Sequence, residues 1–200
     1  MKKIVLLSIV ATLLLTFQVN AQTPTDTPTK HEVNLGVGAI STNQILDFMA
    51  NVIVTTITWT AVHPQNLHYT ATWHAGYKYS LSERWAVGPE FVYDGSTSEL
   101  IVTGNKQGNL SNNYYTLAAA VDFKIVNKDA FKLYSAVGIG GTLFHQVYTP
   151  VTGEKTNATV PYFNFQFTPI GLKFGKTFGG YTELGVGYKG IINAGLFYRF

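Results

Sequence analysis

The chain has 200 residues, of which 14 are Lys or Arg, 11 are Asp or Glu and none is cysteine. A pI of about 9.0 does not indicate a nucleic-acid partner, because removal of Lys2 and Lys3 with a signal peptide leaves 12 basic against 11 acidic residues. Disulfides are excluded. Only 12% of residues are charged while 14% are aromatic, which is typical of a β-barrel exposed to lipid.

Residues 1–21 read as a secretory signal peptide. Met1-Lys2-Lys3 is a short basic start, an apolar run follows to Phe17, and Val19-Asn20-Ala21 offers small residues at the positions that a signal peptidase reads. The expected mature chain of 179 residues (200 − 21) has the length of one domain. We expect residues 22–31 to form a flexible periplasmic leader and residues 32–200 to form the folded domain.

Apolar residues recur at every second position in eight segments, which predicts eight β-strands. The segments cover approximately residues 33–41, 69–79, 85–93, 115–123, 133–143, 163–174, 184–188 and 192–200. In the sixth, the apolar row moves from odd to even positions at Pro169, and we therefore predict a β-bulge at Thr168 and Pro169. The seventh keeps the even phase, which places Tyr188 on the outer surface.

The predicted connections alternate between long and short. The long ones are about Thr42–His68, Asp94–Asn113 and His145–Pro161. Residues 42–61 are unusually apolar and carry helical spacing that Ser41 or Thr42 could cap, although the β-branched run from Val52 could instead extend a strand. Such a helix could lie at the outer leaflet, cover the barrel mouth, pack on its own loops, or present an apolar patch to a surface protein or ligand at 42–68.

The last eight residues read polar-x-Gly-x-x-aromatic-x-aromatic, with Asn193, Gly195, Tyr198 and Phe200 at the defining positions. This ending resembles the C-terminal assembly signal of Gram-negative outer-membrane barrels. The chain as a whole is similar to the small eight-stranded barrels typified by OmpX and the OmpA transmembrane domain. Its stretch from Pro169 to Phe200 most resembles barrel proteins of Bacteroidetes.

The resemblance implies an all-β fold, an eight-stranded antiparallel transmembrane up-and-down β-barrel in the cell outer membrane with both termini periplasmic. Its implied partners are outer-membrane lipid, lipopolysaccharide and the barrel-assembly machinery. The family carries no shared catalytic residues, and we expect no catalytic, cofactor or metal site.

Polar residues on the inner faces of the strands predict a plugged lumen. An eight-stranded barrel is just wide enough for side chains, and buried charges must be paired. A turn centred on Ser82 would place His74 opposite Glu90. The predicted lumen network comprises His74, Lys78, Glu90, Asp122, Lys124, Glu183, Asn193 and Arg199.

Other chemistry is less well supported by the sequence. The GxGxxG pattern at 185–190 lacks the helix that a dinucleotide site requires, and glycines there make room in the lumen. A lipid-A deacylase or acyltransferase would need a serine activated by histidine, and no histidine adjoins a serine on an outward-facing strand. The sequence favours a non-enzymatic barrel with a structural or surface-interaction role. A lipid-A-modifying enzyme and a narrow channel or small-ligand binder are the alternatives.

Overall fold

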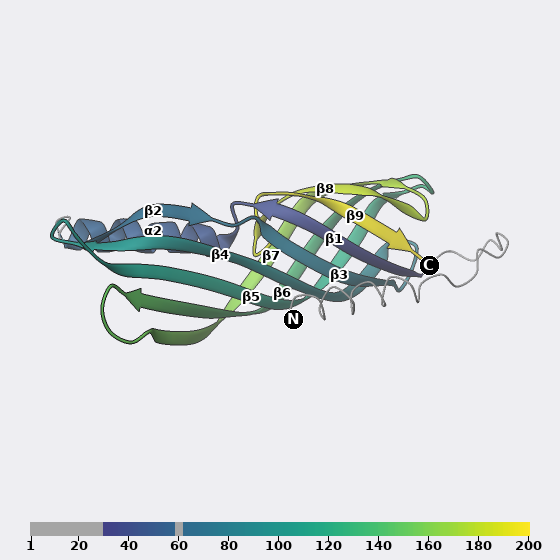
Figure 1. Ribbon diagram of the computed structural model, residues 1–200. Helices are drawn as coiled ribbons and strands as arrows, with labels where there is room; N and C mark the ends of the chain where they lie inside the picture. The colour runs from purple at the N-terminus through teal and green to yellow at the C-terminus, as the bar shows by residue number, and fades with distance from the viewer. Residues whose placement is uncertain (1–29, 59–61) are drawn as a thin grey trace.

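The computed structural model describes residues 30–58 and 62–200, so the predicted signal peptide and nearly all of the leader lie outside the described residues. The chain forms one helix and nine strands within these ranges (Figure 1). They are β1 His31–Ala39, α2 Thr42–Ile57, β2 Val62–Tyr69, β3 Thr72–Ser80, β4 Trp85–Val102, β5 Asn105–Asn127, β6 Phe131–Pro150, β7 Thr156–Gly175, β8 Phe178–Gly187 and β9 Ile192–Arg199.

Eight of the strands close into a ring. The order is β4-β3-β1-β9-β8-β7-β6-β5, every neighbouring pair is antiparallel, and β5 pairs back onto β4. The chain is an eight-stranded antiparallel β-barrel. This closed order confirms the predicted fold class and strand number.

The first strand begins earlier than predicted. His31, which we assigned to the leader, pairs with Tyr79 of β3. Its Nδ1 lies 2.6 Å from the hydroxyl of Tyr77, and its ring stacks on Phe200 at 5.4 Å. The ladder therefore holds residue 31 at the end of the barrel where β9 also ends, which we call the short-turn end.

At the opposite end, the long-hairpin end, the connections predicted as loops are mostly strand. β5 has 23 residues, roughly 75 Å at about 3.3 Å per residue, whereas about 9–11 tilted residues cross a bilayer. β4, β5, β6 and β7 continue beyond the barrel and β2 pairs with the outer part of β4. We call these outer parts, 62–69, 94–102, 105–113, 144–150 and 156–162, the projecting sheet (Figure 1).

The predicted second strand, 69–79, corresponds to β3 in the barrel, and the end of the predicted loop before it forms β2 in the projecting sheet. Both pair with β4, with a break at Thr70 and Ala71. The hairpin between β4 and β5 turns on Thr103 and Gly104, whose φ values of 48° and 78° are those of a tight two-residue hairpin turn.

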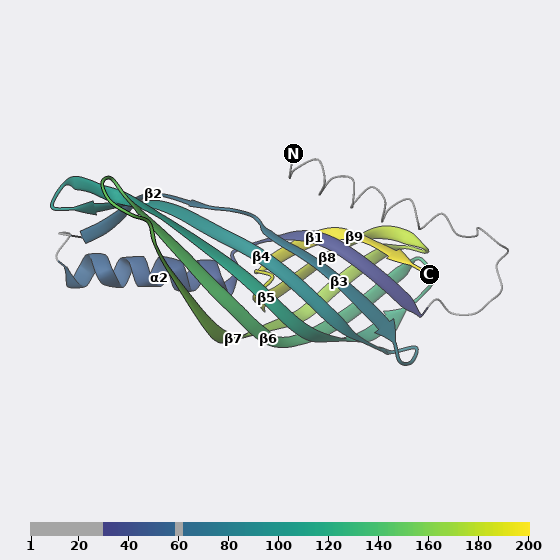
Figure 2. The same cartoon turned by 60° about the horizontal axis from the view of Figure 1, so that its bottom comes forward.

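Residues 42–57 form the helix α2, which confirms the helical reading of this segment over the strand. Ser41 caps it: the Ser41 hydroxyl accepts from the backbone N–H of Gln44, and the Gln44 side chain accepts from the N–H of Ser41. Figures 1 and 2 show α2 leaving the end of β1 and running alongside the projecting sheet, close to β2. No helix in the described ranges is long and apolar enough to cross a membrane.

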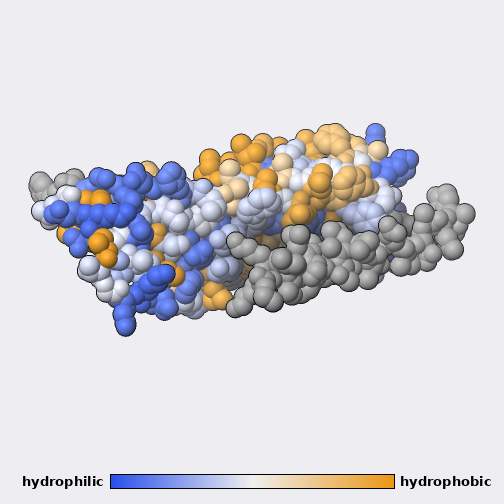
Figure 3. Space-filling model, viewed as in Figure 1, coloured by the Kyte–Doolittle hydropathy of each residue, from blue (hydrophilic) through white to orange (hydrophobic). Residues whose placement is uncertain are grey.

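Large apolar side chains cover the outside of the barrel and are sparse on the projecting sheet. On β5 the outward row changes from Leu117 and Tyr115, 65% and 41% exposed, to Asn113 and Ser111. On β6 the change falls between Leu143 and His145. Figure 3 shows hydrophobic residues gathered over β1, β8 and β9, while the projecting part is mostly hydrophilic. The barrel therefore carries an outer apolar band that ends where the projecting sheet begins.

Candidate functional site

A continuous series of ion pairs runs through the lumen. Acidic and basic side chains alternate along it, so each inner member lies between two opposite charges. We call this set the charge chain, and its members in order are Glu183, Lys189, Glu90, Lys78, Asp122, Lys173, Glu32 and Arg199.

The half of the charge chain nearer the long-hairpin end is built on two lysines. Lys189 Nζ lies 2.8 Å from Glu183 Oε2 and 3.5 Å from Glu90 Oε1. Lys78 Nζ lies 3.1 Å from Glu90 Oε1 and 2.8 Å from Asp122 Oδ1. Glu90 is therefore shared between two ammonium groups.

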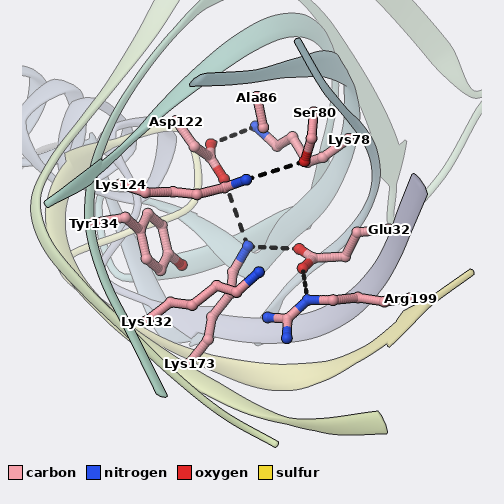
Figure 4. A pocket seen from close by; sticks show the side chains of 10 residues that line it. All are labelled: Glu32, Lys78, Ser80, Ala86, Asp122, Lys124, Lys132, Tyr134, Lys173 and Arg199. Atoms are coloured by element: carbon pink, nitrogen blue, oxygen red, sulfur yellow. Dashed lines mark hydrogen bonds and ion pairs between the residues drawn. The ribbon is translucent and has the colours of Figure 1, made fainter. Parts of the chain in front are cut away.

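The half nearer the short-turn end connects to the terminal strand (Figure 4). Lys173 Nζ lies 3.5 Å from Asp122 Oδ2 and 2.5 Å from Glu32 Oε1. Arg199 Nε donates to Glu32 Oε2 at 2.8 Å, and its Nη1 donates to the carbonyls of Gly175 and Lys176.

Burial makes this pairing necessary. The side chains of the charge chain are only 4% to 11% exposed, and an isolated charge at such a position costs several kcal/mol. Tyrosines satisfy further oxygens: Tyr188 donates to Glu90 at 2.9 Å and Tyr134 donates to Glu183 at 2.6 Å. Because it has four acidic and four basic members, the charge chain as a whole is electrically neutral.

The structure brings five of the eight predicted lumen residues into the charge chain: Lys78, Glu90, Asp122, Glu183 and Arg199. The other three are buried or half-buried beside it. Lys124 donates to Ser80 Oγ at 3.0 Å, His74 Nε2 lies 2.7 Å from the Tyr181 hydroxyl, and Asn193 donates to the Gly190 carbonyl at 3.3 Å.

The predicted register of the β3–β4 hairpin was wrong by two residues. His74 pairs with Val92, and Glu90 pairs with Gly76. Leu81 and Ser82 both donate to the Trp85 carbonyl, so the turn is centred later than Ser82. His74 therefore does not face Glu90.

Sequence reasoning missed Glu32, Lys173 and Lys189. Glu32 and Lys173 lie on the inward faces of their strands, like the predicted lumen residues. Residue 32, however, preceded the predicted first strand, 33–41. Lys189 fell in the connection between the predicted segments 184–188 and 192–200. In the structure Gly187 has φ 141°, which ends the alternation and turns Tyr188 and Lys189 into the lumen. The placement of Tyr188 on the outer surface was therefore wrong: it is fully buried.

The remaining predicted positions lie as follows. The pairing of β7 with β8 shifts register between Phe167 and Ile170, on either side of Thr168 and Pro169. On β9, Gly195 packs against Gly36 and the ring of Tyr181, while Tyr198 and Phe200 stack at 5.9 Å on the outer surface.

The first turn of α2 is anchored in the barrel mouth by buried polar groups. Asn43 donates to Asp94 at 2.9 Å and accepts from the Tyr162 hydroxyl and from Asn164, at 2.6 and 2.8 Å. The Ser41 hydroxyl also donates to Asp94. Ser41, Asn43 and Asp94 are fully buried. We call these contacts, with those of Asp47, the helix anchor.

Asp47 extends the helix anchor by one turn. It accepts from Ser96 Oγ at 2.7 Å and from Asn112 Nδ2 at 2.8 Å. Partial burial, together with the negative charge of Asp47, raises the pKa of the Tyr69 phenol to about 12. Asp47 therefore adds a second attachment of α2 to β4 and also links the helix to β2 and β5.

The polarity of α2 is inverted relative to a helix of a water-soluble protein. Its buried positions are polar, Asn43 and Asp47, while its exposed positions are apolar with the exception of Thr56. The exposed side chains are Leu46, Phe48, Met49, Val52, Ile53, Val54 and Ile57, between 42% and 71% exposed. We call this set the apolar face of α2.

Two histidines of the projecting sheet contact other polar side chains. His145 Nδ1 lies 2.9 Å from Thr159 Oγ1, and His63 Nε2 lies 2.9 Å from Gln65 Nε2. In the part of the chain that the structure describes, no group of three or more His, Cys, Asp or Glu side chains could hold a metal ion. Small lumen cavities have volumes of about 20 and 10 Å³, room for about one or two waters.

No protein-family model and no curated protein matches the chain. Among solved structures it is similar to the N-terminal β-barrel domain of Pseudomonas aeruginosa OprF, with 14% identity and a TM-score of 0.43 over 86% of this chain and 98% of that one. It is also similar to Ail, the attachment invasion locus protein of Yersinia pestis, in complex with the heparin analogue sucrose octasulfate, with 14% identity and a TM-score of 0.46 over 86% and 99%. A second structure of Ail from Yersinia pestis has 12% identity and a TM-score of 0.43, over 87% of this chain and 100% of that one. The barrel assignment itself follows from the closed strand order.

Proposed function

We propose that this chain is a non-enzymatic outer-membrane barrel that acts through its outer surface and not through its lumen. The observation that carries the proposal is the inverted polarity of α2: it is fixed to the barrel mouth by polar groups and turns its apolar face outward. Exposed apolar patches on otherwise polar surfaces are typical of interaction sites. The short-turn end, with both chain ends, would face the periplasm.

The apolar band around the barrel supports insertion in a bilayer, where a closed strand order leaves no backbone edge unpaired in lipid. Outer-membrane lipid and lipopolysaccharide would contact this band. The projecting sheet and α2 would then stand outside the membrane. A lumen filled by side chains, with its buried charges paired along the charge chain, supports a structural and not a conducting role.

Site-specific photo-crosslinking on intact cells tests the interaction surface. A photoreactive amino acid at Ile53, in the apolar face of α2, should give a discrete adduct, whereas one at Lys106, on the exposed tip of the β4–β5 hairpin, should not. Loss of the Ile53 adduct in a Met49→Gln variant would support the apolar contact. Equal labelling at both positions, or no adduct at any residue of the apolar face, would contradict the proposal.

Mass spectrometry of lipid A separates this function from a lipid-A-modifying enzyme. The number of acyl chains should be the same with and without the gene. A changed acyl pattern that depends on His145 or His68 would show that the barrel is a deacylase or acyltransferase.

We also propose that the barrel-assembly machinery reads Asn193, Gly195, Tyr198 and Phe200. Tyr198 and Phe200 expose their rings at the edge of the apolar band, 39% and 46%, where a recognition factor could reach them. Removing Phe200 should reduce the amount of inserted protein in cells. Unchanged insertion would count against the signal.

A further inference from the structure

The short-turn end of the lumen holds more positive charge than its acids can neutralise. The cavity of about 20 Å³ there is lined by five basic and two acidic side chains, with Tyr134, Ser80 and Ala86 completing the wall. The acids are Glu32 and Asp122, and both already pair with members of the charge chain. The surplus comes from Lys124 and Lys132, which lie outside the charge chain.

Neither surplus lysine has a described counter-ion. Lys124 is half-buried and donates to the Ser80 hydroxyl, which is neutral. Lys132 is half-buried, points into the same cavity, and no dashed line reaches it in Figure 4. Neither forms an ion pair with any of the residues that the structure describes. Like charges held together at low dielectric repel one another strongly.

Arg199 supplies an independent observation. It is 4% exposed, and its Nε and Nη1 atoms donate to Glu32 and to two carbonyls, but its Nη2 atom is buried without a hydrogen-bond partner. Leaving a buried guanidinium donor unsatisfied destabilises the folded state, because the donor has lost its hydrogen bonds to water without gaining others. An acceptor placed in the cavity would satisfy this donor and offset the repulsion at Lys132.

We propose that this cavity binds an oxyanion group, a phosphate or a carboxylate, held by Lys132, Lys124 and Arg199. Guanidinium and ammonium groups form strong charge-assisted hydrogen bonds with such groups. The small volume admits only the anionic head of a ligand, and the rest would remain at the open mouth. This site does not depend on the apolar face of α2, which lies at the opposite end of the barrel.

The chain offers an internal control for a binding experiment, because the folded domain contains only two arginines, Arg84 and Arg199. Arg84 lies in the exposed turn between β3 and β4. In ¹⁵N-arginine-labelled protein in uncharged maltoside micelles, inorganic phosphate at constant ionic strength should shift the Arg199 guanidinium signal saturably. The Arg84 signal should not move.

Lys132→Gln should weaken phosphate binding about tenfold, the loss of one charge-assisted contact. Lys128→Gln, which removes the same charge from the exposed turn between β5 and β6, should leave binding unchanged. Phosphate should also raise the unfolding midpoint of the wild type but not of Lys132→Gln. Because Lys132 has no described partner, this variant should fold normally.

Two arms distinguish the source of the anion. A shift with inorganic phosphate alone indicates a free anion, and a shift only when phosphatidylglycerol is added to the micelles indicates a lipid headgroup; either result supports the site. No saturable shift at Arg199 with either probe, or equal shifts in the wild type and Lys132→Gln, would overturn it.

Discussion

At the scale of single residues, the lumen is governed by the cost of burying charge. Each inner member of the charge chain contacts two opposite charges, as Glu90 does with Lys78 and Lys189. A buried pair is a weak source of net stability compared with a hydrophobic core, yet removing one partner is expensive because the other is left uncompensated. The charge chain therefore constrains the sequence more than it stabilises the fold.

Replacing Glu90 by Gln should lower the free energy of unfolding by about 3–5 kcal/mol, because it leaves two buried ammonium groups each with one partner fewer. Urea unfolding in lipid vesicles, followed by tryptophan fluorescence, measures the change. Glu99→Gln is the matched control, since Glu99 pairs with Lys106 on the projecting hairpin at partial exposure. The unfolding midpoint of Glu99→Gln should equal that of the wild type. Equal effects of the two variants would refute the role of burial.

Tyr69 provides a pH-dependent test of the helix anchor. Its folded pKa, about 12, lies above the ordinary phenol value near 10. Its contribution to stability is therefore complete below about pH 10 and is lost as the pH rises toward 12. The difference in tyrosinate absorbance between the wild type and Tyr69→Phe should titrate near pH 12, and Asp47→Asn should lower that midpoint. A midpoint near 10 in the wild type would show that Tyr69 is not held against Asp47.

Several of these residues could be identified from strand alternation alone. Lys78, Glu90 and Asp122 are inward positions of strands with unbroken apolar rows on the other face. The alternation fails after Gly187, whose positive φ sends Tyr188 and Lys189 inward. A backbone reversal of this kind leaves no periodic signal, so the lysine that joins Glu183 to Glu90 could not be found from spacing.

At the scale of elements, α2 is held by polar contacts, which sequence periodicity describes poorly. Its apolar positions predict a helix but also suggest that the apolar side packs inward. In the structure the inward side carries Asn43 and Asp47 instead, because the barrel mouth offers Asp94, Asn164 and Asn112 as partners. These partners come from three different strands, so only the closed barrel brings them together.

Asn43→Ala should release the first turn of α2, since it removes the hydrogen bonds of the buried Asn43 side chain to Asp94, Tyr162 and Asn164. With about 1–3 kcal/mol for each group left unsatisfied, protease cleavage within 42–57 should rise at least about tenfold. Thr56→Ala, an exposed change on the same helix, should leave cleavage unchanged. Unaltered cleavage in Asn43→Ala would mean that the helix is held by other contacts.

The projecting hairpins also differ from their sequence signal. The residues predicted as loops, such as Asp94–Asn113, are mostly polar, and such segments give no regular alternation of polar and apolar residues. They form strands because each continues a ladder already established in the barrel, and because Thr103 and Gly104 supply a tight turn. The extension of a strand pairing whose register is already fixed in the barrel is a tertiary effect, and it cannot be predicted from local composition.

At the scale of the whole molecule, the alternation of apolar and polar residues predicted those features of the barrel that depend on lipid outside and a narrow lumen inside. Eight apolar rows, the approximate limits of the apolar band at Tyr115 and Leu143, and the closed antiparallel order all follow from one face meeting lipid and the other a narrow interior. The height of the projecting sheet could not be predicted in this way, because beyond the apolar band neither face of the strands carries a continuous apolar row. The molecule thus combines a closed barrel with an outer surface built from the projecting sheet and α2.

The most direct test of a closed barrel that works through its exterior is conductance across a planar bilayer. After insertion of the protein, verified by protease protection of the barrel strands, the wild type should give no stable single-channel steps. Its lumen is filled by the charge chain and leaves cavities of only about 20 and 10 Å³. Reproducible, uniform conductance steps in the wild type would contradict the account and favour a narrow channel.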